Sequence, residues 1–318
     1  MRFIALLLLI LFAETALAQA YPSKPIRLVV PFAPGGSSSL VARVMSAEME
    51  KGLGKPFVIE NKPGGGGNIA MQEVARADPD GYTLITGHVG SLAMNPYMYA
   101  KLPYDVDRDF APISLLAIVP AIFVVHADVP AKDLREFVAL AKARPGQINY
   151  GSAGNGSAGH LAMEYLKQVT GMDLQHVPYK GTGPNITDLI AGRTQASSAG
   201  TPPLLPHVKA GKLRVIAVGT SKRLQSIPEV PTVAEQGYPG FETSQWYGLN
   251  APAGTPEPVI RRLAEEAAKA AKSALVLERF KPDDAEPVGS TPAEYGAFIK
   301  KEQERWSKVV RAANIKAD

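Results

Sequence analysis

A run of glycine and serine residues near the start of the chain has the chemistry of an anion-binding turn. Segment 28–43 has the sequence LVVPFAPGGSSSLVAR, in which an apolar strand is followed by Gly35-Gly36 and by serines at 37–39 that open a helix. Glycine lets a ligand approach the main chain, and serine is a preferred helix N-cap. The first amides of a helix are unpaired donors at the positive end of its dipole. The segment therefore predicts a cradle for a small anion, capped by serine.

The same pattern recurs near the middle of the chain. The strand Ile148–Tyr150 leads into the glycine and serine loop Gly151–Ser157, after which a second helix is predicted. In open α/β sheets, ligands bind at the carboxyl ends of the strands. We therefore expect two such loops, one from each of two domains, to close on one small anion.

Fingerprints of catalysis and of cofactor binding are absent or incomplete. Gly154, Gly156 and Gly159 match the dinucleotide pattern G-x-G-x-x-G. The acidic partner of that pattern belongs at the end of the following strand, whereas Asp173 precedes it, so a nucleotide site is not favoured. The chain has neither G-x-S-x-G nor a P-loop, and its five histidines form no H-E-x-x-H. We expect a binding protein rather than an enzyme, with no cofactor and no metal.

Several side chains near these loops allow two interpretations. His88 and His160 adjoin the candidate loops, so each is either a polar ligand contact or a structural hydrogen-bonding residue. Trp246 and Tyr247 either line a binding cleft or pack in a core between domains. Tyr179 offers a hydroxyl group to a ligand.

The first 20 residues have the pattern of a cleaved secretory signal. Arg2 precedes an apolar run from Phe3 to Phe12, and small residues near Ala18 and Ala20 provide a cleavage site. That run is about half the length of a membrane span. The sequence contains no cysteine, which excludes disulfides and thiolate metal sites. We expect an exported protein that is monomeric in the periplasm after cleavage near Ala18 or Ala20.

The charge of the chain fits a small anionic ligand better than a nucleic acid. The formal net charge is +4 at pH 7, without a run of lysine or arginine. Nucleic-acid binding calls for a basic stripe, often with interleaved aromatic residues, and no such stripe is present. We therefore expect no nucleic-acid partner.

Strand and helix signals alternate along the mature chain, which indicates a parallel α/β sheet. The predicted strands are 28–30, 56–60, 82–86, 147–150, 174–177, 195–199 and 213–218. The predicted helices are 38–52, 68–77, 129–143, 160–170, 185–191, 256–274 and 292–313. The glycines at 64–67 are expected to form a flexible surface turn, and residues 200–203 another turn.

A mature chain of about 300 residues suggests two domains. Segment 113–125 is almost entirely apolar with Pro120 in its middle, and a central proline disfavours one continuous strand. We place a crossing between domains near Ile118–Ala121, and the proline-rich run 227–239 is the expected return linker. The first domain is then discontinuous, with residues 21–119 plus 241–318, and the second contains residues 120–240.

Taken together, these residues resemble the periplasmic solute-binding proteins of the tripartite tricarboxylate transporter family, the Bug group. The matching stretches follow one another in order over nearly the whole mature chain, and as a set they are highly specific. They are Pro31–Gly36, Ala42-Arg43, Glu60–Gly65, Asp80–Leu84, Asn95-Pro96, Leu102–Asp105, Tyr150–Gly154, Val177–Gly181, Trp246–Leu249 and Ala251–Pro256.

The resemblance implies a two-lobed type II periplasmic binding fold, in which two Rossmann-like domains with a hinge close a cleft on a small carboxylate, often a dicarboxylate or an aromatic acid. One carboxylate would be held by main-chain amides, hydroxyls and waters between the loops 32–39 and 152–157. The loaded protein would deliver its ligand to membrane subunits of the tripartite transporter. The residues expected at the ligand are Phe32, Ala33, Gly35, Gly36, Ser37, Ser38, Ser39, His88, Ser91, Ser152, Ala153, Gly154, Ser157, Tyr179, Gly200 and Thr201.

Two departures from the family pattern bear on the ligand. The family commonly has an acidic residue where this chain has Ser39, and often Asp-Asn where this chain has Ala199-Gly200. An acidic group at the first position would pair with an amino group, so we expect an acid that lacks an amine. Two alternatives stay open: an exported sensor partner in signalling that binds the same ligands, and an exported α/β enzyme.

Overall fold

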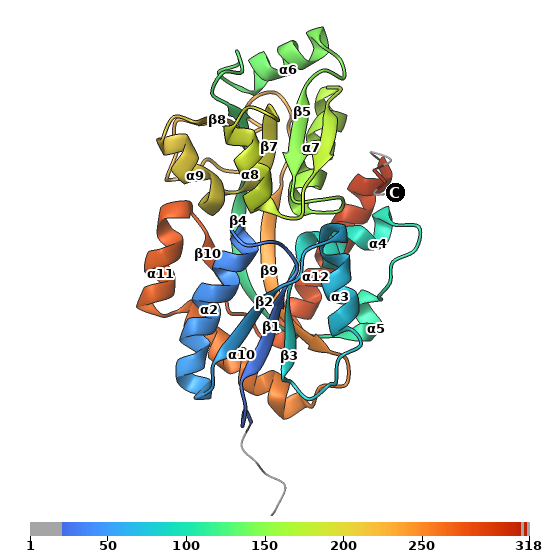
Figure 1. Cartoon of the computed structure of the whole chain (residues 1–318), viewed down its shortest axis with the longest axis vertical. Helices are drawn as coiled ribbons and strands as arrows, with labels where there is room; N and C mark the ends of the chain where they lie inside the picture. Colours follow the sequence, from blue (N-terminus) through green and yellow to red (C-terminus); the bar gives the residue numbers. More distant parts are fainter. Residues whose placement is uncertain (1–20, 313–314, 317–318) are drawn as a thin grey trace, which may run out of the picture.

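The chain folds into two α/β lobes, which two long antiparallel strands connect (Figure 1). The computed structural model describes residues 21–312 and 315–316, so the predicted signal segment lies outside the described residues. The connecting strands are β4 (Phe110–His126) and β9 (Ser244–Pro252). Because β4 takes part in the sheets of both lobes, it fixes their strand directions relative to each other.

The first lobe is a sheet covered by helices on both faces. Its strands β1 (Ile26–Val30), β2 (Phe57–Asn61) and β3 (Thr83–His88) are parallel, and β9 joins β3 in the antiparallel direction. A two-residue strand, β10 (Glu286–Pro287), pairs with β4. One face packs on α2 (Ser37–Leu53), α10 (Glu257–Ala271) and α11 (Ala274–Phe280). The other face packs on α3 (Asn68–Val74), α4 (Asn95–Met98) and α12 (Pro292–Ala312), with the short α5 (Val106–Asp109) beside it.

The second lobe repeats this three-layer plan. Its strands are β5 (Asn149–Ser152), β6 (Gln175–Pro178), β7 (Ala196–Gly200) and β8 (Leu213–Val218), and the full strand order is β2-β1-β3-β9-β4-β7-β5-β6 with β8 and β10 on β4. Helices α6 (Leu134–Ala143) and α7 (Ala158–Thr170) cover one face. Helices α8 (Thr182–Ile190) and α9 (Thr201–Lys209) cover the other.

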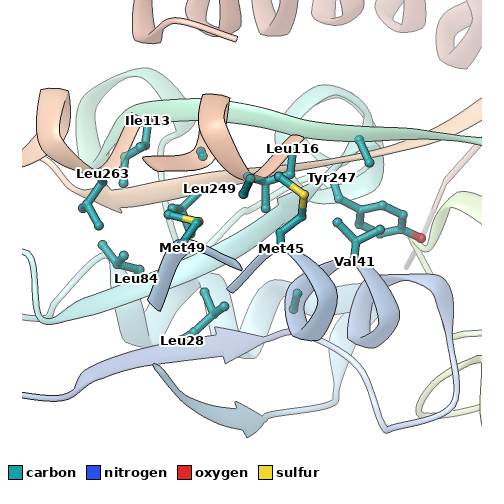
Figure 2. Close-up of a cluster of buried hydrophobic side chains, with 14 of the residues drawn as sticks. Leu28, Val41, Met45, Met49, Leu84, Ile113, Leu116, Tyr247, Leu249 and Leu263 are labelled. Atoms are coloured by element: carbon teal, nitrogen blue, oxygen red, sulfur yellow. The ribbon is translucent and has the colours of Figure 1, made fainter. Parts of the chain in front are cut away.

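The core under α2 positions the glycine and serine turn. Val41, Met45 and Met49 recur every four residues, so they share one face of the helix. Figure 2 shows this face directed at the sheet, where Leu28 and Leu84 lie. Burial of apolar side chains contributes about 25 cal/mol per Å², which holds the helix on the sheet. Its first turn is therefore held at the carboxyl end of β1, at the boundary between the lobes.

The prediction that Pro120 interrupts the strand is wrong, because β4 continues through it. β4 pairs with β9 as far as Pro120, which lies opposite Ser244, and with β7 from Ala121 onward. Proline lacks a main-chain donor and is tolerated where no ladder hydrogen bond is needed. The change of partner strand within segment 118–121 provides such a place.

Three further expectations are corrected. The sheet is mixed rather than parallel, because β4 and β9 are antiparallel to their neighbours. The expected turn at 200–203 is the start of α9, since proline is accepted in the first turn of a helix. The single helix predicted over 256–274 consists of α10 and the beginning of α11, which are separated because Ser273 caps the second helix.

Candidate functional site

The first turn of α2 supplies a group of buried, uncharged donors. Ser37, Ser38 and Ser39 are 2%, 3% and 4% exposed, and they form the first helical turn themselves. The expected serine cap is therefore wrong: the N-cap is Gly36, whose extended φ of -107° places the serines inside the helix. The amides of this turn have no partner within the helix. The turn can therefore donate main-chain hydrogen bonds to an anion at the positive end of the helix dipole.

The hydroxyl group of Ser37 is buried without a hydrogen-bond partner. It points across the boundary between the lobes, because a Cβ added to Gly200 would overlap it. It also lies beside the phenol of Tyr247; burial raises the pKa of that phenol above its usual range, and the neighbouring Ser37 hydroxyl lowers it. A buried hydroxyl without a protein partner is expected to form a hydrogen bond with a ligand or an ordered water. Ser198 on β7 and Thr86 on β3 also bury unpartnered hydroxyls.

Asn61 is a polar contact that the sequence reasoning missed. Its side-chain amide donates to the carbonyl of Phe32 at 2.7 Å and to Oγ of Ser39 at 3.1 Å. It therefore joins the end of β2 to the turn before α2. A signal was available, since Asn61 directly follows the predicted strand 56–60, and ligands bind at the carboxyl ends of strands in α/β sheets.

The loop after β5 uses its serine hydroxyls to hold its own shape. Ser152 Oγ accepts from the Gly154 amide at 3.0 Å and lies 2.7 Å from Nε2 of His176. Ser157 caps α7 by accepting from the amide of His160 at 3.3 Å. The Ser152 hydroxyl is therefore held by the loop and by His176 of β6, whereas the Ser157 oxygen accepts the capping bond and leaves its O–H group, with the main-chain amides, as a donor for a ligand.

Two stacked histidine side chains hold this loop in place by hydrogen bonds. His160 Nδ1 accepts from the Gly156 amide at 3.2 Å, and the rings of His160 and His176 stack at 4.1 Å between centroids. Burial lowers the pKa of His160 to about 4 and that of His176 to about 3. His160 is therefore neutral near pH 7, with a hydrogen-bonding role inside the protein.

His88 likewise uses both ring nitrogens within the first lobe. Nδ1 accepts from the Gly90 amide at 3.0 Å, and Nε2 lies 3.2 Å from the carbonyl of Gly66. Burial lowers its pKa to about 4, and its ring packs 4.8 Å from that of Phe32. Ser91 Oγ donates to the His88 carbonyl at 3.2 Å. Neither side chain has a polar group left for a ligand, so both hold the loops around the site.

The hydroxyls of Tyr179 and Thr201 are also engaged. Tyr179 donates to Asp188 at 2.8 Å, and burial together with that carboxylate raises the pKa of Tyr179 to about 12. Thr201 donates to the carbonyl of Asp283 in the first lobe at 2.5 Å. Trp246 is fully buried and donates to Glu302 at 2.9 Å, so it belongs to a core.

The lobes meet along an interlobe seam, formed by residues 33–37, 66, 90 and 99 of the first lobe and 154–156, 179–183 and 200 of the second. The Ala33 amide donates to the Lys180 carbonyl at 3.0 Å, and the Tyr99 hydroxyl donates to the Asn155 carbonyl at 3.0 Å. Both contacts pass directly from one lobe to the other. The structure is therefore a closed arrangement.

Glycine residues at the interlobe seam allow the main chains of the two lobes to approach each other closely. A Cβ added to Gly66 would overlap the carbonyl oxygen of Asn155, one added to Gly90 that of Gly156, and one added to Gly183 that of Pro34. The glycines at 64–67, expected as a flexible surface turn, thus include a buried residue that contacts the second lobe.

At the outer edge of the seam lies a cavity of about 290 Å³. Ser39 and Arg43 of α2 line it on one side, and Pro202 and Pro203 of α9 on the other. Of the residues predicted at the ligand, Gly35, Gly36 and Ser39 line this cavity, and Ala33, Gly154 and Gly200 lie on the seam. Across residues 21–312 and 315–316, no group of histidine and acidic side chains is arranged to hold a metal ion.

Two α/β lobes closing over uncharged hydrogen-bond donors define a solute-binding protein. Residues 41–315 match the family described as "Tripartite tricarboxylate transporter family receptor", and the chain belongs to that family. This match confirms the resemblance derived from the sequence motifs, and the two-lobed fold that the resemblance implied is the one that the structure and its solved relatives have. The family consists of transport receptors, which also confirms the expectation of a binding protein rather than an enzyme.

Solved structures agree with this assignment. The periplasmic binding protein BugD is 34% identical, with a TM-score of 0.90 over 93% of this chain and 99% of that one. A protein of R. palustris solved with adipate is 36% identical, with a TM-score of 0.90 over 93% and 99%. MatC from Rhodopseudomonas palustris with bound malate is 35% identical, with a TM-score of 0.88 over 91% and 100%. Within the part of the chain that the structure describes, no helix is long and apolar enough to cross a membrane.

Proposed function

We propose that this chain captures a small carboxylate without an amino group between its lobes and delivers it to the membrane subunits of a tripartite tricarboxylate-type transporter. The observation that carries the proposal is the first turn of α2, where buried serines and amides without a helical partner lie at the seam with the second lobe. Such a set of donors matches a carboxylate. Two related structures, described as solved with adipate and with malate, support the same class of ligand.

We expect the ligand to lack an amino group because of the side chains at the first turn of α2. Ser39 is uncharged, and its hydroxyl accepts from the side-chain amide of Asn61. Arg43 is the charged side chain at the neighbouring cavity, and it repels an ammonium group. A ligand with carboxylates alone therefore fits this end of the seam better than an amino acid.

Neutral donors suffice for useful affinity. A hydrogen bond to a charged group contributes about 1.5–3 kcal/mol, and a helix N-terminus about 0.3–2 kcal/mol. Four or five such contacts approach the ~8 kcal/mol of a micromolar complex after some ordering cost. No buried arginine is required.

The proposal also covers export of the chain to the periplasm and the division of the mature chain into two lobes. Residues 1–20 direct export to the periplasm and are removed near Ala18 or Ala20. The mature protein acts as a monomer whose lobes are residues 21–119 plus 241–318 and residues 120–240. The exchange of β4 partners after Pro120 supports this division.

A thermal-shift screen tests the ligand class. Malate and aspartate form a matched pair, because they differ by a hydroxyl against an ammonium group, and adipate adds a longer dicarboxylate. A ligand at 100 times its Kd adds about 2.7 kcal/mol to stability. We expect malate or adipate to raise Tm and aspartate and dimethyl malate to leave it unchanged. Stabilisation by aspartate alone would refute the exclusion of amines, and no shift with any carboxylate would refute carboxylate binding.

A further inference from the structure

A second contact between the lobes lies outside the seam, at the turn that connects α11 to β10. The carboxylate of Asp284 accepts two main-chain hydrogen bonds, from the Gln225 amide at 3.1 Å and from the Ser226 amide at 2.9 Å. Each carboxylate oxygen takes one of them. The neighbouring Asp283 carbonyl accepts from Thr201 at 2.5 Å.

The two sides of this contact belong to different cores. Phe280 and Ala285, which flank the turn, are buried in the first-lobe cluster with α2 and α10. Leu224 and Ile227, which flank the two donor amides, are buried in the second-lobe cluster with α8 and α9. The hydrogen bonds at Asp284 therefore connect one lobe directly to the other.

This contact is on a different edge of the molecule from the contact at Tyr99. Figure 1 shows α11 below α9 along one edge, whereas α4, which ends beside Tyr99, lies along the opposite edge. The strands β4 and β9 pass between the two edges (Figure 1). A bond at each edge resists rotation of the lobes about the connecting strands.

The backbone at Asp284 does not need an aspartate side chain. Asp284 has a φ of 51° and is, within residues 21–312 and 315–316, the one non-glycine residue with positive φ. Glycine adopts this conformation without penalty, and aspartate and asparagine adopt it more readily than other residues. Replacement by glycine therefore removes the carboxylate while it relaxes the turn.

We propose that Asp284 is an interlobe latch, which stabilises the closed arrangement through the amides of Gln225 and Ser226 and touches no bound solute. The latch holds part of the population closed in the absence of solute. Its contribution to affinity rests on the proposed function, since closure is useful for binding only if the solute lies between the lobes. The apparent affinity for the solute is proportional to the fraction of protein in the closed state. Loss of a hydrogen bond that forms only in the closed state therefore lowers the apparent affinity in the same proportion as it lowers that fraction.

The test measures closure by the distance between two spin labels. Lys51 of α2 and Arg135 of α6 are exposed and lie in different lobes. The sequence contains no cysteine, so Lys51→Cys and Arg135→Cys give a doubly labelled full-length mature chain. Distances are recorded by pulsed electron paramagnetic resonance without solute and with malate or adipate, for Asp284→Gly, Asp284→Asn and the unsubstituted residue. Asp283→Asn is the matched control, because it removes a carboxylate one residue away and keeps the carbonyl that Thr201 uses.

Asp284→Gly is expected to lower the closed-to-open ratio about tenfold in both conditions, with Tm of the solute-free protein unchanged or higher. Asp284→Asn is expected to lower the closed-to-open ratio by an intermediate amount, and Asp283→Asn is expected to change it little. Equal closed fractions for Asp284→Gly and the unsubstituted chain would overturn the latch, as would a chain with aspartate at 284 that shows no closed fraction without solute. If malate and adipate do not bind, the ligand proposal fails, while the solute-free distances still decide the latch.

Discussion

At the scale of single residues, some hydroxyl groups hold the shape of the loops and others are buried at the seam without a hydrogen-bond partner. Ser91 donates to the His88 carbonyl, Ser152 bonds to Gly154 and His176, and the Ser157 oxygen caps α7. Ser37 instead keeps an unpartnered buried hydroxyl at the seam. The sequence showed which residue types were present, but it could not show which hydroxyls fold back, because that depends on loop geometry.

Ser39→Asp tests whether the start of α2 faces the solute. Ser39 lines the cavity at the seam, and a carboxylate there repels a dianionic ligand. A like charge at about 6 Å costs about 3 kcal/mol at an effective dielectric constant near 20. Titration calorimetry with malate or adipate is expected to give a Kd at least tenfold higher for Ser39→Asp than for the unsubstituted chain. Ser39→Asn is the uncharged control, and an unchanged Kd in Ser39→Asp would show that this residue does not face the solute.

At the scale of helices and strands, the sequence predicted most elements and missed those that depend on a partner. The strand and glycine turn before α2 and the strand and loop before α7 were both recognisable from local pattern. The continuity of β4 through Pro120 was not, because a proline is acceptable there only where the partner strand changes. The burial of Gly66 was also missed, because Gly66 is covered by the carbonyl group of Asn155, a residue far away in the sequence.

Gly183→Ala tests the role of the seam at the start of α8. Gly183 has ordinary helical geometry, and alanine favours a helix over glycine by up to about 1 kcal/mol. In the closed arrangement, however, its Cβ would overlap the Pro34 carbonyl of the other lobe. We expect unchanged or higher Tm without solute, together with an affinity for malate or adipate at least tenfold lower.

Gly296→Ala is the matched control for that experiment, because the added Cβ would meet Pro112 at an ordinary 3.5 Å. Calorimetry and thermal unfolding are measured on the same preparations. A Gly183→Ala variant that binds as tightly as Gly296→Ala would contradict a role for this glycine in closure.

At the scale of the whole molecule, buried histidines connect stability to pH. Burial lowers the pKa of His88 and His160 to about 4 and that of His176 to about 3, whereas histidine in an unfolded chain has a pKa near 6.5. Between those values the unfolded chain binds more protons than the folded one, so stability falls as pH falls below about 6.5. Each histidine contributes up to about 1.4 kcal/mol per pH unit in that window.

Urea unfolding at pH 7 and pH 5 is expected to show this loss, and His88→Gln is expected to flatten the dependence. The variant is less stable at pH 7, where the neutral imidazole holds the Gly66 and Gly90 loops. His207→Gln on α9 serves as the control substitution. Equal stability of the parent protein at the two pH values would contradict neutral burial of these histidines.

The interlobe seam also determines how substitutions at its glycines would be detected. Gly183 and Gly200 have ordinary φ, and the atoms that exclude a Cβ from them belong to the other lobe. Each lobe can therefore fold with a side chain at these positions, and the defect arises only when the lobes meet. In a library of variants, a screen for expression or thermal stability would accept such changes, whereas a screen for growth on the transported solute would reject them. The difference between the two screens, position by position, would outline the closing surface without a further structure.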